Sequence, residues 1–539
     1  MLDDLAMLWR FATGLHGFLA RPLAPAQCRQ LVEESLHRRN QAFLLLMRRA
    51  VYGYPHSPYR RLLQWAGVEL GDLEKLVNDE GVEGALEKLY DAGVRIALDE
   101  FKGRRPIRRS GFQIGVRSED FDNPLLAREF EVQTSGSAGP RRRLAIDFDL
   151  LVYEAACRYV MHTAQGICGR PAAIWRPVPP GSSGLKNALQ AAKMGAPLER
   201  WFSPNRVSCR PAMLKSAVFT AVAVGGARLW GGLVPRPEYV PLSRAVIVAR
   251  WLAGKAAAGR PAFLSAAANS VVRICLAAQD AGLDLSGTVF RVGGEPFSHA
   301  KAQVVHSAGA RTFSSWAMSE SGPLGGGCAN PEFLDEVHLY DGKAAVLQRP
   351  VTAPDGACVA GALHLTTLLP ATPKIMLNVE TGDYGVLASR RCGCLFEKLG
   401  LRRHLHTIRS YEKLTAGGMH VMGADVVRLV EEVLPARHGG APTDYQVIED
   451  QRGALTQVTV VVSPRVKGID ESRLLKDVVG YLASRSRDYR MMAQQWMNGK
   501  SLHVARRSPY STATGKVPPL RVVPAGPGRE GSMGGATGG

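Results

Sequence analysis

The sequence EVQTSGSAGPRRRLAIDF, at positions 131–148, holds a loop of small residues between two apolar segments. Six small residues in a row occupy 134–139, and Pro140 and three arginines follow them. Small residues let several backbone N–H groups point into one concavity, and hydroxyls add donors, so such a loop suits the oxygens of a phosphate. Clusters of serine, glycine and proline are also the usual composition of a surface linker. The loop alone leaves both interpretations open.

The composition is that of a globular protein with more than one domain. A chain of 539 residues is too long for a single hydrophobic core, so its length predicts about two to four domains. Hydrophobic residues make up 46% of the chain and charged residues 21%, which excludes a disordered protein. The chain is therefore expected to build a real core.

The chain is strongly basic. Its 67 lysines and arginines against 48 aspartates and glutamates give a formal charge of +19, which raises the question of a nucleic-acid partner. The basic residues are spread along the whole chain, and no segment resembles a nucleic-acid module. This distribution argues against nucleic acid and favours small anions such as nucleotides and thioester carriers.

The nine cysteines are an odd number, and most stand singly in apolar surroundings, as Cys157, Cys209 and Cys275 do. This pattern is typical of reduced thiols. The sequence opens MLDD, acidic where a secretory signal would be basic. No apolar run approaches the roughly 18 residues of a membrane helix. We therefore expect a soluble cytoplasmic protein without a membrane partner, and the sequence leaves a homodimer open.

The composition and the periodicity of the sequence change along the chain. Residues 1–110 are rich in leucine, arginine, glutamate and alanine, with helical spacing over 28–52, and predict a helical N-terminal region of the large domain. Over 111–410, short β-branched and apolar runs alternate with helical stretches, which predicts an α/β core of layered sheets and helices.

A smaller α+β unit is predicted over 411–524. It contains a glycine-rich hairpin over 412–423, a helix, a strand pair and one long helix over 470–492. The glycine-rich tail at 525–539 is predicted to be disordered.

Five further short motifs follow the opening loop in a fixed order. They are GGEPF at 293–297, SSWAMSE at 314–320, ETGDYG at 380–385, RSYEKLTAGGMHV at 409–421 and STATGKV at 511–517. In this order they resemble the adenylate-forming superfamily of acyl-CoA ligases, firefly luciferase and adenylation domains. The segment SPYRRLLQWAG at 57–67 and a Cys-x-Cys resemble its phenylacetate-CoA ligase-like branch.

The resemblance implies a large N-terminal domain and a small mobile C-terminal domain with the active site between them. It implies that ATP and Mg²⁺ activate a carboxylic acid to an acyl-adenylate, with release of pyrophosphate. The acyl group then passes to a thiol, and coenzyme A is the expected acceptor. Other members use a carrier-protein thiol or an amine, and a member that binds nucleotide without turnover is a further alternative.

The resemblance also implies roles for single residues. Lys516 matches the lysine that bridges the α-phosphate and the acyl carboxylate, and Glu320, next to Ser319, matches the Mg²⁺-binding glutamate. Asp383 matches the aspartate that takes both ribose hydroxyls. The other nucleotide contacts would be Thr134, Ser135, Gly136, Ser137 and Gly139 at the phosphates, Gly293, Gly294 and Glu295 beneath adenine, Trp316 stacked on adenine, and Arg409 before the hinge.

The motifs depart from the family pattern at a few positions. Ala138 stands where a threonine is common, and Arg141 stands where a lysine usually follows the proline. Ala317 replaces a glycine that normally lines the acyl pocket, and the aromatic residue before TGD is missing. The extra methyl group at Ala317 argues against a large aromatic substrate.

A second constellation does not involve ATP. Cys328 and His338 are spaced C-x9-H, and Cys392 and Cys394 follow as C-x-C. Three thiolates and one imidazole suit tetrahedral Zn²⁺, and four protein ligands would make the site structural. Buried thiols beside a surface histidine are the alternative. The C-x-C recurs in the branch that this chain resembles, which favours zinc.

Overall fold

The computed structural model describes most of the chain. The described residues are 2–126, 130–133, 143–179, 182–207, 214–230, 233–294, 297, 299–352, 358–359, 361–410, 413–414, 421–440, 444–451, 453–485, 487–510 and 519–523.

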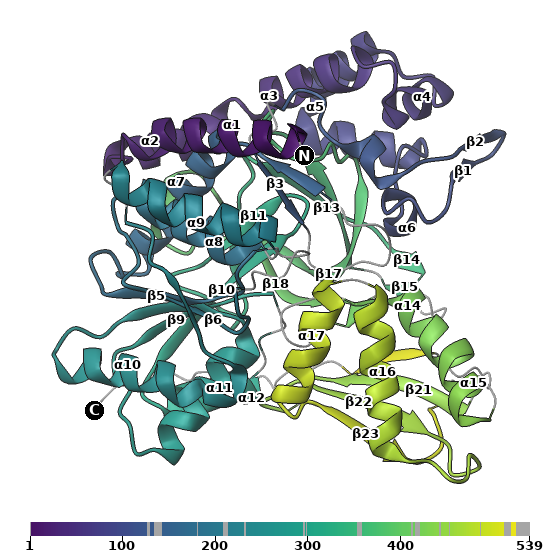
Figure 1. The fold of residues 1–539 in the computed structure, drawn as a ribbon. Helices are drawn as coiled ribbons and strands as arrows, with labels where there is room; N and C mark the ends of the chain where they lie inside the picture. The colour runs from purple at the N-terminus through teal and green to yellow at the C-terminus, as the bar shows by residue number, and fades with distance from the viewer. Residues whose placement is uncertain are drawn as a thin grey trace, which may run out of the picture.

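Twelve of the described strands form one large mixed sheet (Figure 1). In spatial order they are β13 (Ala344–Gln348), β16 (Ala362–Thr367), β17 (Val379–Ser389), β18 (Arg403–Ser410), β12 (Val337–Leu339), β11 (Gly322–Gly327), β10 (Arg311–Met318), β9 (Val289–Val292), β8 (Phe263–Ala266), β5 (Ala172–Trp175), β6 (Arg200–Ser203) and β7 (Pro237–Tyr239). The half from β10 to β7 is parallel, whereas the other half is antiparallel.

Helices cover both faces of the parallel half, as apolar strands of this kind require. Along β5, Ile174 belongs to the hydrophobic core under one helical layer, whereas Ala173 and Trp175 belong to the core under the other. One layer contains α7 (Phe148–Ala164), α8 (Ser182–Lys193) and α9 (Leu214–Leu229), and the other contains α10 (Ala245–Ala257), α11 (Ala268–Asp280) and α12 (His299–Ser307) (Figure 1). The predicted fold class, a layered α/β domain, is confirmed.

The first hundred residues are largely helical, and in Figure 1 most of them run across the top of the molecule. Their helices are α1 (Leu2–Leu19), α2 (Pro25–His37), α3 (Arg39–Leu46), a π-helical turn η1 (Met47–Tyr52), α4 (Pro58–Trp65), α5 (Leu70–Asp91) and α6 (Leu98–Phe101). The helical spacing over 28–52 spans more than one of them. The break lies at Arg38, which has φ −94° and ψ 8° and donates its N–H to the carbonyl of Glu34.

Short elements fill the remaining connections of the large domain. They are hairpins β1 (Ile107–Arg109) with β2 (Phe112–Ile114), β3 (Phe130–Gln133) with β4 (Arg143–Ile146) and β14 (Val351–Thr352) with β15 (Cys358–Val359), and short helices η2 (Ser118–Phe121), η4 (Leu242–Arg244) and α13 (Leu395–Lys398).

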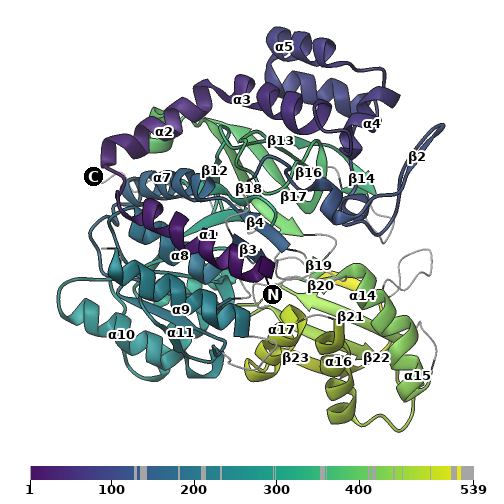
Figure 2. The same ribbon diagram turned by 45° about the horizontal axis from the view of Figure 1, so that its top comes forward.

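A second sheet, in the order β23, β22, β21, β24, forms the C-terminal unit (Figure 2). Its strands are β21 (Tyr445–Asp450), β22 (Gln457–Val462), β23 (Leu502–Arg506) and β24 (Leu520–Val523). Its helical segments are α14 (Gly423–Arg428), η5 (Leu429–Val433), α15 (Leu434–His438), α16 (Glu471–Arg485) and α17 (Arg487–Asn498). Before it, β19 (Lys413–Leu414) pairs with β20 (Val421–Met422), in the predicted hairpin.

The predicted strand pair is present as antiparallel β21 and β22. The predicted single helix over 470–492 is wrong, because α16 ends at Arg485 and α17 begins at Arg487. Leu482 of α16 and Trp496 of α17 lie in the same hydrophobic core. A straight helix of 23 residues would be about 35 Å long and would carry its far end past that core.

The C-terminal unit contacts the large domain through polar side chains. Lys301 donates from Nζ to Oγ1 of Thr456 at 3.0 Å, and the Thr456 N–H donates to Oδ1 of Asn269 at 3.2 Å. On α17, Gln495 donates to Oδ1 of Asn205 at 3.3 Å. The last of these contacts places α17 beside the segment after β6, at the carboxyl end of that parallel strand. Across the described part of the chain, no helix combines the length and apolar character that a bilayer crossing needs.

Candidate active site

Several predicted site residues lie outside the described residues. They are Thr134, Ser135, Gly136, Ser137 and Gly139 of the loop, Glu295, and Lys516. The hinge residue Glu412, the Gly417–Gly418 turn and the tail after 524 lie outside them too. Their predicted roles stay predictions.

The structure gives a reason for each of the two described glycines of GGE. A Cβ built on Gly293 would lie 2.7 Å from both the carbonyl oxygen and Oγ of Ser315, so no side chain fits there. Gly294 has φ +85°, a conformation that glycine adopts without strain. The two residues follow β9 at the carboxyl edge of the parallel sheet, where α/β folds bind ligands.

This edge opens into a cavity of about 210 Å³. Its lining includes the predicted residues Gly293, Gly294 and Ser319, together with Ala317 and Met318. Ala317 therefore contacts the cavity, as its match to a pocket-lining glycine implied. The other walls come from α7, α8, β5, β9 and β11, and from Met491 and Gln495 of α17.

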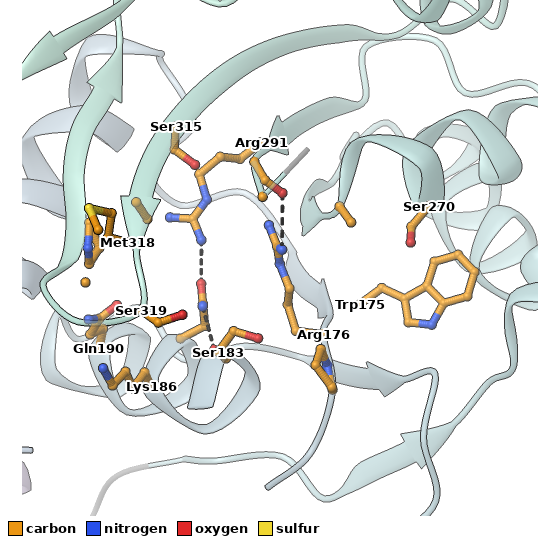
Figure 3. Close-up of a pocket in the computed structure, with 18 of the residues that line it drawn as sticks. Trp175, Arg176, Ser183, Lys186, Gln190, Ser270, Arg291, Ser315, Met318 and Ser319 are labelled. Carbon is orange, nitrogen blue, oxygen red and sulfur yellow. Dashed lines mark hydrogen bonds between the residues drawn. The ribbon is translucent and has the colours of Figure 1, made fainter. Parts of the chain in front are cut away.

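Four cationic side chains line this cavity: Arg158 on α7, Arg176 after β5, Lys186 on α8 and Arg291 on β9. Figure 3 shows Arg176 and Arg291 side by side, with Lys186 on the helix that faces them. Arg176 donates to the carbonyl oxygens of Ala266 and Gly293, at 2.7 and 3.4 Å. The wall is therefore rich in N–H donors.

Arg291 is also buried, and it has neutral partners. It donates from Nε to Oγ of Ser265 at 3.0 Å, and it donates through its guanidinium to Oδ1 of Asn187 (Figure 3). Burial and the nearby Arg158 and Arg176 guanidinium groups hold the pKa of Arg291 well below its usual range.

Among the described residues that line the cavity there is one carboxylate, that of Glu154. Lys343 donates to its Oε1 at 2.7 Å, and Gln190 donates to its Oε2 at 2.6 Å. The side chains of Glu154 and Lys343 are each 1% exposed. The hydrogen-bond donors to Glu154 therefore lie outside the group of four cations.

Glu320, the predicted Mg²⁺ ligand, is buried, and its carboxylate forms an ion pair with the ammonium group of Lys102. A magnesium ion at this carboxylate would share it with Lys102. Ser319, the preceding residue, faces the cavity instead.

Trp316 and Asp383 come together across the sheet. The indole Nε1 of Trp316 donates to Oδ2 of Asp383 at 3.3 Å. The N–H of Asp383 donates to Oγ1 of Thr381 at 3.1 Å, so both ends of the aspartate are held. Trp316 is 5% exposed and is not among the residues that line the cavity.

Arg409 lies at the end of β18 and binds within the large domain. Its guanidinium donates to Oδ2 of Asp335 at 2.8 Å, and Asp335 also accepts the N–H groups of Thr407 and Ile408 at 2.8 and 2.9 Å. These bonds fix the strand that leads to the C-terminal unit. The contact between Arg409 and the nucleotide stays a prediction.

The four predicted zinc ligands do come together. The ligand atoms of Cys328, His338, Cys392 and Cys394 all lie within 4.8 Å of one another. Nε2 of His338 is 3.1 Å from Sγ of Cys394 and 3.5 Å from Sγ of Cys392. These residues reach the cluster from the end of β11, from β12 and from the loop before α13.

The second ring nitrogen of His338 has a partner of its own. Nδ1 lies 2.8 Å from the carbonyl oxygen of Leu401, so Nδ1 carries the proton and Nε2 presents its lone pair to the thiols. A hydrogen bond from Cys328 lowers the pKa of the Cys394 thiol. The alternative of a surface histidine is wrong, because His338 is fully buried.

Sequence reasoning missed the cationic side of the cavity. The signals were faint: Arg158 stands in an apolar helix, CRYVM, and Arg291 interrupts the apolar strand TVFRV. A charge at a buried position of a strand or helix requires a partner, and that requirement could have singled out both arginines. Lys186 carried no such signal.

No protein-family model matches the chain, and a search of curated proteins finds no relative. Solved structures do match. 2-Hydroxyisobutyryl-CoA ligase in complex with 2-HIB-AMP and CoA, in the thioesterification state, is 12% identical, with a TM-score of 0.50 over 93% of this chain and 91% of that one.

Two further solved structures match with lower TM-scores. The same ligase in an open conformation is 11% identical, with a TM-score of 0.42 over 93% of each chain. The amide bond synthetase McbA from Marinactinospora thermotolerans is 12% identical, with a TM-score of 0.28 over 94% of this chain and 98% of that one. The first match shows that the chain has the fold of an adenylate-forming ligase.

Proposed function

We propose that this chain is an ATP-dependent acid ligase. It joins a carboxylic acid to AMP with release of pyrophosphate, and it then passes the acyl group to a thiol, that of coenzyme A. The observation that carries the proposal is the fold, because it matches, over 93% of the chain, a ligase whose solved complex holds an acyl-AMP and CoA. The cavity beside Gly293, Gly294 and Ser319 supports it.

The proposed chemistry needs positive charge at the attacked phosphate. The acid oxygen attacks the α-phosphorus, and negative charge grows on the phosphate oxygens as pyrophosphate leaves. Lys516, moving with the C-terminal unit that begins near 411, supplies this charge for adenylation. Asp383 binds the ribose hydroxyls, since a carboxylate accepts two hydrogen bonds. Mg²⁺, bound with ATP near Glu320, would neutralise further phosphate charge.

We also propose that Cys328, His338, Cys392 and Cys394 hold a structural Zn²⁺. In a tetrahedral site, ligand bonds of about 2.3 Å to sulfur and 2.0–2.1 Å to nitrogen place these atoms about 3.6 Å apart. The distances from His338 Nε2 to the two thiols, 3.5 and 3.1 Å, are near that value. Four protein ligands leave no open position, so this metal has no part in the reaction.

Pyrophosphate release tests the function. The purified protein is given ATP, Mg²⁺ and a panel of carboxylic acids, with acid-free samples as the control. We expect acid-dependent pyrophosphate release, followed by thioester formation once coenzyme A is added. If coenzyme A does not accept the acyl group and a carrier-protein thiol or an amine does, coenzyme A is the wrong acceptor. Nucleotide binding without release for any acid would identify a member without turnover and reject the proposal.

A further inference from the structure

The cavity holds two cations, Arg158 and Lys186, that form no hydrogen bond or close ion pair within the described residues, although the Glu154 carboxylate attracts both. Arg158 is 6% exposed and Lys186 is 8% exposed. Within the described part of the chain, neither side chain forms a hydrogen bond or a close ion pair. Arg176 and Arg291 add two more cations to the same wall, and Glu154 is already matched by Lys343. The cavity therefore has an excess of buried positive charge.

Such an excess is costly in an empty protein. An ion taken out of water without a partner loses several kcal/mol of solvation. Burial lowers the pKa of Lys186 and lowers the pKa of Arg158 to about 10, although the Glu154 carboxylate acts in the opposite direction on both. An anion bound in the cavity would supply the missing partner to both groups.

The size of the cavity limits that anion. The described lining residues surround a volume of about 210 Å³. It is below the roughly 300–1,000 Å³ of a site for a drug-sized ligand. A short acid fits this space.

We propose that the acid substrate carries a second anionic group and is a short-chain dicarboxylic acid. One carboxylate lies near Ser319 and the Gly293–Gly294 turn and is activated, and the other binds Arg158 and Lys186. This proposal rests on the proposed function, and it adds the substrate class to it. A monocarboxylic acid of equal length would leave both cations buried without a partner.

Matched acids test the selectivity. Butyrate, succinate and succinamate have the same chain length and differ only in the second terminal group. We expect kcat/KM for pyrophosphate release to be at least about tenfold higher with succinate or glutarate than with the corresponding monoacid or monoamide, since a charge-assisted hydrogen bond is worth about that factor or more. Equal rates with butyrate and succinate would overturn the substrate class and leave the proposed function standing.

Variants test the two cations. Arg158→Met and Lys186→Met should each lower the ratio of succinate to butyrate kcat/KM by about tenfold or more. Arg250→Met removes an exposed cation of α10 and should leave the ratio unchanged. If a methionine variant does not fold, judged by circular dichroism, Arg158→Gln or Lys186→Gln replaces it. A ratio that no variant changes would overturn the proposal.

Calorimetry separates this proposal from the proposed function. Succinate is titrated into the protein without ATP, and inorganic pyrophosphate serves as the competing probe. We expect succinate to bind, and Lys186→Met to weaken it. Succinate binding without pyrophosphate release from any acid would reject the ligase and keep the anion site. If Lys186→Met weakens pyrophosphate but not succinate, the site serves ATP phosphates and the dicarboxylic acid is wrong.

Discussion

Glu154 and Arg158 lie one turn apart on α7 and line the same cavity, yet their surroundings differ. A glutamate and an arginine that are four residues apart on a helix are spaced to form an ion pair. Both oxygens of Glu154 are instead taken by Lys343 and Gln190, so Arg158 stays without a carboxylate partner. The difference separates a charge that the fold itself neutralises from a charge that we propose a ligand neutralises.

The Cys/His cluster extends this comparison, and it should give the largest effect. We expect about one zinc per chain, and we expect a chelator or Cys392→Ser with Cys394→Ser to remove it and lower the melting temperature, because structural zinc contributes about 10–16 kcal/mol in small zinc domains. Cys168→Ser, at an exposed thiol, is the control. If protein purified without chelators contains no zinc, the four residues are stabilised by contacts within the fold and hold no metal.

Lys343 tests the neutralised side of the comparison. Lys343→Met removes the cation from a pair that is 1% exposed at both ends and leaves Glu154 buried with Gln190 alone. We expect a loss of about 3–5 kcal/mol in the free energy of unfolding, measured by denaturant titration. An unchanged midpoint would mean that Glu154 finds another cation, Arg158 being the nearest candidate on its own helix.

Lys516 is proposed to act on bound ATP, so its substitution should affect catalysis rather than stability. Lys516→Ala should lower acid-dependent pyrophosphate release by about 10²–10³-fold, equivalent to about 3–4 kcal/mol. With synthetic acyl-AMP, the same variant should still transfer the acyl group at a rate near that of the unmodified protein. Lys467→Ala, at an exposed lysine of the same unit, is the control. An equal fall in both steps, or in neither, would contradict the role.

Asp383 has a partner within the fold, because it accepts a hydrogen bond from Trp316. It is also proposed to bind a ligand, through the ribose hydroxyls of ATP. Asp383→Ala should weaken ATP by about tenfold or more, measured by calorimetry, with little change in the melting temperature. Asp383→Asn keeps an acceptor for the Trp316 indole and removes the charge, so it separates the two contacts. Unchanged ATP affinity in both variants would reject the ribose contact.

Lys186 should give the smallest stability effect. Lys186→Met removes a buried charge that has no partner, so we expect a free energy of unfolding within about 1 kcal/mol of the original or above it. The measurement is the same denaturant titration as for Lys343→Met. If both substitutions destabilise the protein equally, the charge of Lys186 is stabilised within the fold. The contrast between charges that the fold neutralises and charges that a ligand neutralises would then be wrong.

The sequence predicted what lies close together along the chain. The motifs around Gly293, Ser319 and Asp383 could be named because each is a short run of residues with its own local chemistry. The Cys/His cluster was predicted from residue types together with the family resemblance of the Cys-x-Cys, although its members are far apart in the sequence. The division into domains at 411 stays a prediction.

The missing parts depend on contacts that only the folded chain brings together. Arg158, Lys186 and Arg291 come from two helices and a strand, and no spacing in the sequence joins them. The partner of Glu154 is 189 residues away, so the helix spacing that favours Arg158 gives the wrong pair. The break after Arg485 likewise depends on one core packing against both α16 and α17.

Met491 and Gln495 of α17 have a kinetic consequence. They form part of the cavity wall although they belong to the C-terminal unit, so a rotation of that unit would remove this wall and admit water to the cations. Exchange of the acid and movement of Lys516 would then be one event. The acid would enter and the product would leave only between the closed states, and turnover would be paced by domain motion.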